Sequence, residues 1–252
     1  MEKSLSKTSL FLRSLCFGIV QVIFPPIWAC ICFLTIWLPF PLRYYIATRW
    51  NVATIWFAKI ICGIDYQVIG KENLPNVPSI ILSKHQSAWE TIFLITVPPR
   101  PLSFVLKKEL LYIPFFGWAL ALMRNIPIDR SQGVSAIRQL VRKGNQRLKD
   151  GQWVVIFPEG TRTTVGKKGK YLNGGSRLAI ESGAPVVPIA LNAGECWPRN
   201  SFIKKPGLIT VSIGKPIDPK GRSADDLMSD VQNWIESEML RISPDIYPSN
   251  EP

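Results

Sequence analysis

The sequence of 252 residues predicts an α/β fold, with a layered mixed sheet flanked by helices and preceded by an N-terminal membrane-embedded helical segment. After Gly63, short apolar runs alternate with amphipathic segments, which is the order expected of a sheet covered by helices. The runs at 79–83 (SIILS) and 153–157 (WVVIF) are apolar without alternation, as in strands buried on both faces. Before this region, no charged residue occurs from Ser14 to Leu42.

The uncharged N-terminal stretch is long enough to cross a bilayer, which takes about 20 apolar residues. Pro25 and Pro26 divide it, and proline removes a helical hydrogen bond and clashes with the preceding turn. The stretch is therefore either a hairpin of two short helices in one leaflet or a single kinked spanning helix. Basic residues flank it on both sides, and because such flanks prefer the cytoplasmic side, they favour the hairpin. A cleaved signal peptide is disfavoured, because no small-x-small cleavage site follows the run. The flanking basic residues are Lys3, Lys7 and Arg13 before the stretch, and Arg43, Arg49 and Lys59 after it.

Residues 44–62 continue with aromatic and aliphatic side chains around Arg49 and Lys59. This pattern fits an amphipathic helix at a membrane interface, and it fits a helix packed on the folded domain equally well. We expect residues 1–62 to form an N-terminal membrane-associated segment and residues 63–252 to form the folded domain. The flanking charges predict a membrane location on the cytoplasmic face, which would be the inner membrane in a bacterium.

The folded domain contains seven predicted strands and five predicted helices, assigned from apolar runs, turn residues and helical periodicity. The strands are expected at 65–69, 79–83, 102–106, 126–128, 153–157, 186–191 and 208–213. The helices are expected at 88–96, 115–123, 133–149, 174–182 and 223–241.

Charge and motif content narrow the classes of function. Lys and Arg number 30 against 18 Asp and Glu, a formal net charge of +12, which suits a polyanion or an anionic membrane surface. No nucleic-acid motif accompanies this charge, so a non-catalytic membrane protein that binds nucleic acid is a weak alternative. None of the five cysteines forms a C-x-x-C pair, so neither a zinc site nor a disulfide framework is expected. The absence of G-x-S-x-G and of glycine-rich phosphate loops disfavours serine-hydrolase and common nucleotide-binding chemistry.

The single histidine is the first candidate for catalysis. His85 directly follows the predicted strand at 79–83, and sites in layered α/β sheets usually form at such strand-to-helix turns. Histidine suits a general base near neutral pH. Glu90, in the first turn of the next predicted helix, could orient the imidazole and stabilise the imidazolium. Ser87 and Glu90 also form an S-x-x-E capping box, which would explain both residues without catalysis.

Three predicted strands end in basic residues. The segment FPEGTR at 157–162 closes the strand at 153–157 and ends in Arg162, while Arg130 and Lys107 follow two other strands. Arginine suits bidentate contact with phosphate. These three groups could therefore converge on one anion, although each could also be a solvated surface charge.

Together these segments resemble the lysophosphatidic acid acyltransferase family, the 1-acyl-sn-glycerol-3-phosphate O-acyltransferases. Four blocks occur in order: the histidine block at 85–90, a block at 117–130 that ends in an arginine, FPEGTR at 157–162 and the run VVPI at 186–189. The resemblance covers about residues 10–215 and implies a glycerolphosphate acyltransferase-like catalytic domain. One departure is Glu90, where the family usually carries Asp, so the carboxylate has a longer reach.

The resemblance implies an enzyme of phospholipid biosynthesis that makes phosphatidic acid. It would move a fatty acyl group from a thioester, on acyl-CoA or acyl carrier protein, to the sn-2 hydroxyl of lysophosphatidic acid. It implies no metal, no cofactor beyond the acyl donor, the membrane bilayer as a partner and no nucleic acid. The alternative is an acyltransferase of the same superfamily that acts on another lysophospholipid or a lipid A precursor. A lipid-modifying hydrolase that releases the fatty acid to water is a further alternative.

The resemblance also implies roles for individual residues. His85 would act as the base and Glu90 would hold its ring. Glu159 would orient Arg162 or support the turn, and backbone N–H groups near Gly160 would stabilise the oxyanion. The implied group that binds the substrate phosphate is Arg162, Lys107, Arg130, Glu159, Gly160 and Thr161. Segment 199–222, with six Lys and Arg and one Asp, is either a docking surface for the acidic acyl carrier protein or a solvated loop and strand face.

Overall fold

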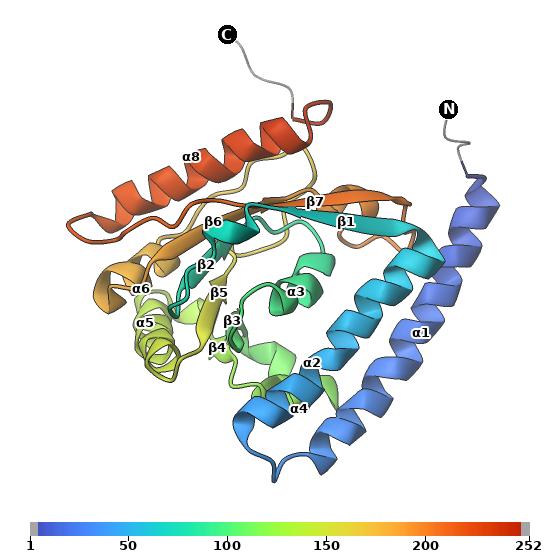
Figure 1. Ribbon diagram of the computed structural model, residues 1–252, viewed down its shortest axis with the longest axis horizontal. Coiled ribbons are helices and arrows are strands. Elements are labelled where there is room, and N and C mark those ends of the chain that lie inside the picture. The colour runs from blue at the N-terminus through green and yellow to red at the C-terminus, as the bar shows by residue number, and fades with distance from the viewer. Residues whose placement is uncertain (1–4, 248–252) are drawn as a thin grey trace.

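Residues 5–247 are the part of the chain that the computed structural model describes, and they contain a mixed seven-stranded sheet (Figure 1). The strand order is β1-β7-β6-β2-β5-β3-β4, and neighbouring strands are parallel except for the antiparallel pair β6 and β7. The predicted mixed sheet is thereby confirmed. The strands are β1 (Ile64–Ile69), β2 (Ile80–Ser83), β3 (Leu102–Lys107), β4 (Ile126–Ile128), β5 (Trp153–Ile156), β6 (Val186–Leu191) and β7 (Gly207–Ile213).

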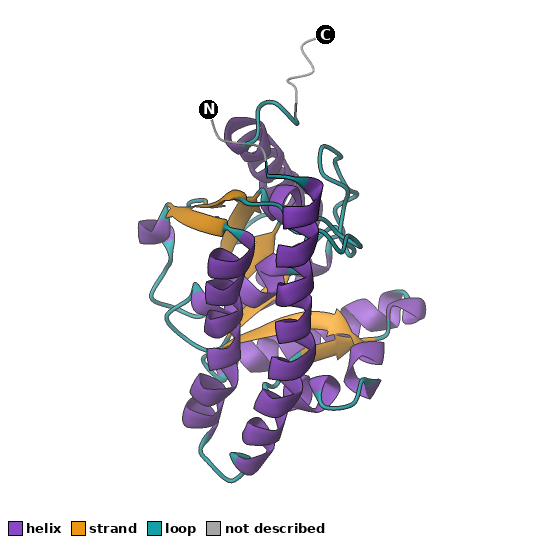
Figure 2. Cartoon of the chain, turned by 90° about the vertical axis from the view of Figure 1, so that its right-hand side faces the viewer, coloured by secondary structure: helices purple, strands orange, loops and turns teal. Residues whose placement is uncertain are grey.

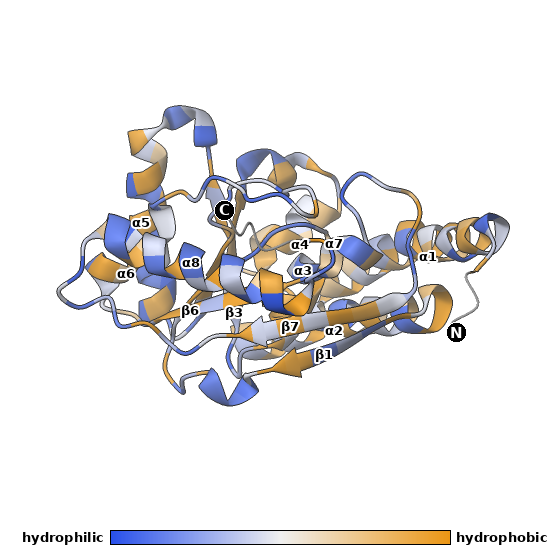
Figure 3. Cartoon of the chain, turned by 90° about the horizontal axis from the view of Figure 1, so that it is seen from above, coloured by the Kyte–Doolittle hydropathy of each residue, from blue (hydrophilic) through white to orange (hydrophobic). Residues whose placement is uncertain are grey.

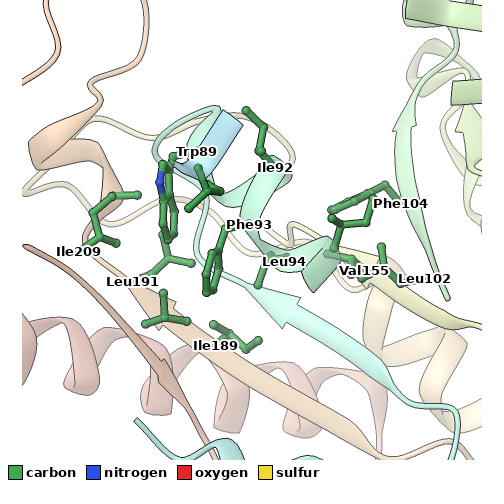
Figure 4. Close-up of a cluster of buried hydrophobic side chains, with 14 of the residues drawn as sticks. Trp89, Ile92, Phe93, Leu94, Leu102, Phe104, Val155, Ile189, Leu191 and Ile209 are labelled. Carbon is green, nitrogen blue, oxygen red and sulfur yellow. The ribbon is translucent and has the colours of Figure 1, made fainter. Parts of the chain in front are cut away.

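Helices cover both faces of the sheet. They are α3 (Trp89–Phe93), α4 (Phe116–Leu122), α5 (Val134–Lys149), α6 (Gly174–Ser182), α7 (Ala193–Cys196) and α8 (Ala224–Ile242). Ile81 of β2 belongs to one buried cluster with α3, whereas Ile80 and Leu82 belong to a second cluster with α5, α6 and α8. Figure 4 shows the first cluster, in which the rings of Trp89 and Phe93 stack with centroids 4.5 Å apart. Burial on both sides explains why these strands are apolar without alternation.

Two long helices precede the sheet and pack against each other (Figure 2). They are α1 (Lys7–Leu34) and α2 (Phe40–Phe57), and a π-helix, Ala58–Cys62, continues α2. Trp28 Nε1 donates to Ile46 O at 3.1 Å, and Gln21 Nε2 donates to Thr54 Oγ1 at 3.5 Å. Contacts that fall earlier in α1 therefore meet residues later in α2, so the two helices are antiparallel.

The favoured hairpin of two short helices divided at Pro25 and Pro26 is wrong, because α1 runs through both prolines as one helix, in agreement with the other expectation of a single helix. The ring of Phe24, just before them, lies 5.6 Å from that of Trp28 and 5.8 Å from that of Phe57, centroid to centroid. Aromatic packing along α1 and onto α2 thus supports the helix where the prolines cannot donate hydrogen bonds. The chain reverses instead between the end of α1 and the start of α2.

The N-terminal helices have one buried and one exposed face. Phe17 of α1 and Tyr44 of α2 belong to the same buried cluster as the sheet, and Asn51 Nδ2 donates to Ile92 O at 3.2 Å. Residues 44–62 therefore pack on the folded domain, which was one of the two expectations for this segment. Among the described helices, α1 is the one whose length and composition suffice to cross a membrane, and hydrophobic residues recur along it in Figure 3. Exposed apolar side chains include Phe11, Ile19, Val22, Ile23 and Ile27 of α1, and Tyr45, Val52 and Trp56 of α2.

The sheet topology gathers the candidate site residues at one edge. Strands β2, β5, β3 and β4 are consecutive parallel neighbours, so the loops that follow them leave the same edge. Lys107, at the end of β3, is the register partner of Ile128, at the end of β4. The loops at this edge hold His85, Arg130 and the segment 157–162.

Candidate active site

His85 lies in the loop between β2 and α3, and its ring is held by a buried carboxylate. Its Nδ1 is 2.9 Å from Glu90 Oε1; the Glu90 side chain is fully buried, whereas 15% of the His85 side chain is exposed. A carboxylate at Nδ1 favours the tautomer with the proton on that nitrogen. The lone pair of Nε2 is then free to accept a proton.

Glu90 also holds the backbone of the loop just before α3 and so forms one half of the predicted capping box. Its Oε1 accepts hydrogen bonds from the backbone N–H groups of Gln86 and Ser87, both at 2.6 Å, while Ser87 Oγ accepts from Trp89 N at 3.0 Å. The hydrogen bond from Ser87 N–H to Glu90 that the capping box predicts is present, but the box is incomplete, because the N-cap residue of α3 is Ala88 and no side chain caps it. Because two backbone donors fix the carboxylate, it offers the imidazole a rigid acceptor.

The loop after β5 packs around the histidine. The Phe157 ring stacks on the His85 ring with centroids 3.9 Å apart and an interplanar angle of 16°. Thr163 holds the backbone of His85, because its N–H and its Oγ1 both donate to His85 O, at 2.8 and 3.2 Å. The FPEGTR segment therefore begins against the candidate base, and the residue that follows the segment, Thr163, returns to it.

Lys107 and Arg130 line a common pocket of about 410 Å³ at the same edge, as their positions after neighbouring strands predict. Lys108 pairs with Asp129 and lowers the pKa of that carboxyl below its usual range, while burial lowers the pKa of Arg130. The remaining lining groups are Glu109 and Ser131. With Asp129 neutralised by Lys108, Lys107 and Arg130 leave the pocket an excess of positive charge suited to an anion.

The Gly160 turn connects this pocket to the histidine. Arg130 Nη1 donates to Gly160 O. Gly160 has a φ of +68°, a left-handed conformation that favours glycine. Gly160 N donates to Phe157 O at 3.0 Å, so this N–H is occupied within the turn. Any oxyanion donor near this turn would therefore be a backbone N–H group other than that of Gly160, and this expectation stays a prediction. Thr161 is exposed and Arg162 is partly exposed, two residues beyond the turn.

The Glu159 side chain is buried beneath the Gly160 turn, where it pairs with Lys84. Its carboxylate is 2.8 Å from the buried ammonium of Lys84, which also lies 2.7 Å from Glu236 on α8; Tyr171 OH donates to Glu236 at 2.9 Å. Burial raises the pKa of Glu159, and its pairing with Lys84 opposes this. The Glu159 carboxylate thus faces the buried Lys84 behind the turn and is not exposed to solvent.

The buried side chains on either side of His85 were not predicted from the sequence as part of the site. Lys84 and Gln86 flank His85, and each is tied to the C-terminal region: Lys84 to Glu236 and Gln86 Nε2 to the Tyr247 hydroxyl. The only signal in the sequence is that Lys84 directly follows an apolar strand. Unless the position of Glu236 is known, such a lysine cannot be distinguished from a solvated charge. The loop is thus fixed on one side by α8 and on the other by Glu90.

The side chains of three of the six basic residues in segment 199–222 contact other described residues. Arg199 Nη1 donates to Arg162 O, Lys204 Nζ donates to Ser201 O at 2.8 Å, and Arg222 pairs with an acidic residue of α8. The other three, Lys205, Lys215 and Lys220, are exposed, so both interpretations of this segment stay open. Arg199 in addition supports the loop that carries Arg162.

Comparisons with known proteins find acyltransferases over most of the chain. A family model described as Acyltransferase matches residues 65–192. A 1-acyl-sn-glycerol-3-phosphate acyltransferase of Pseudomonas aeruginosa is 49% identical over 211 residues, which cover 82% of each chain. The chloroplastic 1-acyl-sn-glycerol-3-phosphate acyltransferase LPAT1 of Arabidopsis thaliana is 32% identical over 78% of this chain, which spans 54% of that protein. A protein of the same description from Saccharomyces cerevisiae is 30% identical over 71% of this chain and 61% of its own.

A solved structure shares the fold. The crystal structure of the 1-acyl-sn-glycerophosphate (LPA) acyltransferase PlsC from Thermotoga maritima superposes with a TM-score of 0.78 at 22% sequence identity. The match covers 92% of this chain and 95% of that one, so it includes the N-terminal helices as well as the sheet.

Proposed function

Because the chain belongs to the 1-acyl-sn-glycerol-3-phosphate acyltransferase family, we propose that it acylates the sn-2 hydroxyl of 1-acyl-glycerol-3-phosphate from a thioester donor. The product is phosphatidic acid. One observation carries the proposal: the hydrogen bond between His85 and the buried Glu90 lies at the sheet edge that also holds the cationic pocket of Lys107 and Arg130.

The site supplies a base but needs no enzyme nucleophile. His85 Nε2 removes the proton of the sn-2 hydroxyl as its oxygen attacks the thioester carbonyl carbon. When the tetrahedral intermediate collapses, the carbon–sulfur bond breaks and the imidazolium returns the proton to the leaving thiolate. A positioned general base typically contributes about 10²–10⁴-fold to the rate. Glu90 stabilises the imidazolium that exists between these two steps.

Replacing the orienting carboxylate tests its contribution separately from the cap. We expect Glu90→Gln to lower kcat by about 10²-fold or more, because the amide cannot stabilise the imidazolium. Glu90→Asp keeps the charge found in most of the family and should retain activity within about tenfold. Both kcat values are measured with lysophosphatidic acid as the acceptor. Equal losses in the two variants would show that Glu90 acts only as a cap.

The acceptor phosphate is proposed to bind between the histidine and the pocket of Lys107 and Arg130. Three contacts connect the histidine to the pocket through one loop. Thr163 donates to His85 O, Gly160 O accepts from Arg130, and Arg130 lines the same pocket as Lys107. Arg162 lies between Gly160 and Thr163 in the loop and does not line this pocket, so its contribution to phosphate binding is proposed from its place in the loop. A phosphate held here would place the glycerol hydroxyl toward the imidazole.

Removal of a phosphate-binding cation should act on acceptor binding. We expect Lys107→Ala and Arg162→Ala each to raise the acceptor KM about tenfold or more, since a hydrogen bond to a charged group contributes about 1.5–3 kcal/mol. The value of kcat should change little. Lys167→Ala, an exposed lysine of the same loop, is the matched control. An acceptor KM that stays at the wild-type value in both variants would reject the assignment.

A membrane location on the cytoplasmic face is part of the proposal. The acceptor and the product are lipids, and each methylene extracted into water costs about 0.8 kcal/mol, so a site at the bilayer surface avoids a large penalty. The apolar exposed side of α1 supports contact with the lipid, and Arg13 and Arg43 near its ends suit anionic headgroups. Coenzyme A and acyl carrier protein remain the two proposed carriers of the acyl group.

An acceptor panel tests the proposed reaction. Membranes containing the protein are given a radiolabelled acyl thioester with lysophosphatidic acid, other lysophospholipids or a lipid A precursor. We expect labelled phosphatidic acid with the first acceptor at a rate well above all the others. A higher rate with another acceptor would replace the proposal with that activity. Release of free fatty acid at the same rate with and without an acceptor would indicate a hydrolase.

A further inference from the structure

A groove lined by arginines lies beside the acceptor pocket and has no part in the mechanism above. It is an open groove of about 900 Å³ between α5, α6 and the start of α8. We call it the arginine groove. Its lining residues are Val134, Ile137, Arg138, Val141, Arg142, Arg177, Ile180, Glu181, Arg222, Ser223 and Ala224.

The groove combines unneutralised positive charge with an apolar floor. Within residues 5–247, no ion pair of Arg138, Arg142 or Arg177 is present, and all three side chains are exposed. The other charged lining groups are engaged, because Glu181 accepts from Asn145 and Arg222 pairs with Asp230. The apolar members are accessible, with Val134 64% and Ile180 39% exposed.

The groove opens near the sheet edge that carries the histidine. Helix α5 starts shortly after β4, and Ser131 of the acceptor pocket is three residues from Val134 of the groove. Asn173, the N-cap residue of α6, donates to Asp225 and so draws the start of α8 to the same region. A molecule bound in the groove therefore lies next to the pocket of Lys107 and Arg130.

We propose that the arginine groove binds the phosphorylated adenosine end of coenzyme A, so that donor and acceptor phosphates have separate sites. This rests on the proposed acyl transfer. Guanidinium groups from two helices match several phosphates at once, and aliphatic side chains between them suit a flat purine. A volume of about 900 Å³ is that of a small-molecule site. A carrier protein would instead need roughly 800 Å² of surface on each partner.

The test compares two donors that differ only in the nucleotide. Palmitoyl-CoA and palmitoyl-pantetheine carry the same thioester, and the second lacks the phosphorylated adenosine. For the double variant Arg138→Ala/Arg177→Ala we expect the KM for palmitoyl-CoA to rise about tenfold or more, with the kinetics of palmitoyl-pantetheine within twofold of wild type. Arg147→Ala is the matched control, because this arginine lies at the other end of α5 and pairs with Asp150.

A binding measurement separates this inference from the proposed reaction. Adenosine 3′,5′-bisphosphate is titrated calorimetrically into the wild-type protein and the double variant, without an acyl group or an acceptor. We expect binding to the wild type and at least tenfold weaker binding to the variant, whatever the acceptor proves to be. Equal binding, or an equal loss of rate with both thioesters, overturns the inference. A variant that fails only with palmitoyl–acyl carrier protein would also overturn it, and would assign the groove to a protein donor.

Discussion

We expect His85→Ala to lower the acyl-transfer rate by at least about 10²-fold and by up to about 10⁴-fold, the contribution typical of a positioned base. The loss should fall on kcat, because the substitution leaves the proposed phosphate site at Lys107 and Arg130 in place. The measurement is steady-state transfer to lysophosphatidic acid in mixed micelles. Activity within tenfold of wild type would exclude His85 as the base.

The sequence offers a second route to the same question, because the chain contains one histidine. Diethyl pyrocarbonate, which acylates imidazole, can modify histidine only at His85. We expect inactivation in step with the modification of one imidazole, reversal by hydroxylamine, and protection by lysophosphatidic acid. Retained folding of His85→Ala, checked by circular dichroism, ensures that the lost rate reports chemistry. Full activity of the modified protein would contradict the role of His85.

We expect Lys84→Met to destabilise the fold by about 3–5 kcal/mol, the cost of leaving a buried charge without its partner. Methionine fits the space but leaves Glu159 and Glu236 facing each other without the ammonium that separates them. Without the ammonium that opposes the effect of burial, the folded-state pKa of the Glu159 carboxyl would rise further above that of the unfolded chain. A carboxyl with a raised pKa stabilises the fold at low pH and loses that contribution as the pH rises. The deficit of Lys84→Met should therefore be larger at pH 7.5 than at pH 5.

Denaturant unfolding in detergent at the two pH values measures this deficit. Glu236→Gln is the matched variant, because it leaves one ammonium against one carboxylate and keeps an acceptor for the Tyr171 hydroxyl. Its free energy of unfolding should stay within about 1 kcal/mol of wild type. If Lys84→Met unfolds at the wild-type midpoint at both pH values, the buried network contributes no stability.

The elements that the sequence predicted well are those whose pattern is set by burial on both faces of the sheet. The runs at 79–83 and 153–157 lie in β2 and β5, because a strand covered on both sides leaves an uninterrupted apolar signature. The helix predicted at 174–182 has the observed bounds, since Gly183 ends it in a left-handed conformation. These are local signals that need no knowledge of the neighbours.

The errors arise where a distant partner decides the outcome. Pro25 and Pro26 break a helix by local rules, and contacts with α2 override those rules. For Lys84, the decisive carboxylate lies on α8, 152 positions later in the chain, and no local pattern distinguishes a buried ammonium from a solvated one. In the site, by contrast, His85 and Glu90 are five residues apart and share one turn, so their hydrogen bond could be predicted.

The attachment of the histidine loop to the C-terminal region has a consequence for how the chain tolerates shortening. Glu236 and Tyr247 lie beyond residue 192, where the matched family region ends, yet they fix the two neighbours of His85. A premature stop codon or a protease cut before α8 would leave every motif residue present while the loop lost its backing. Intact motifs in a truncated gene are therefore poor evidence of a working enzyme.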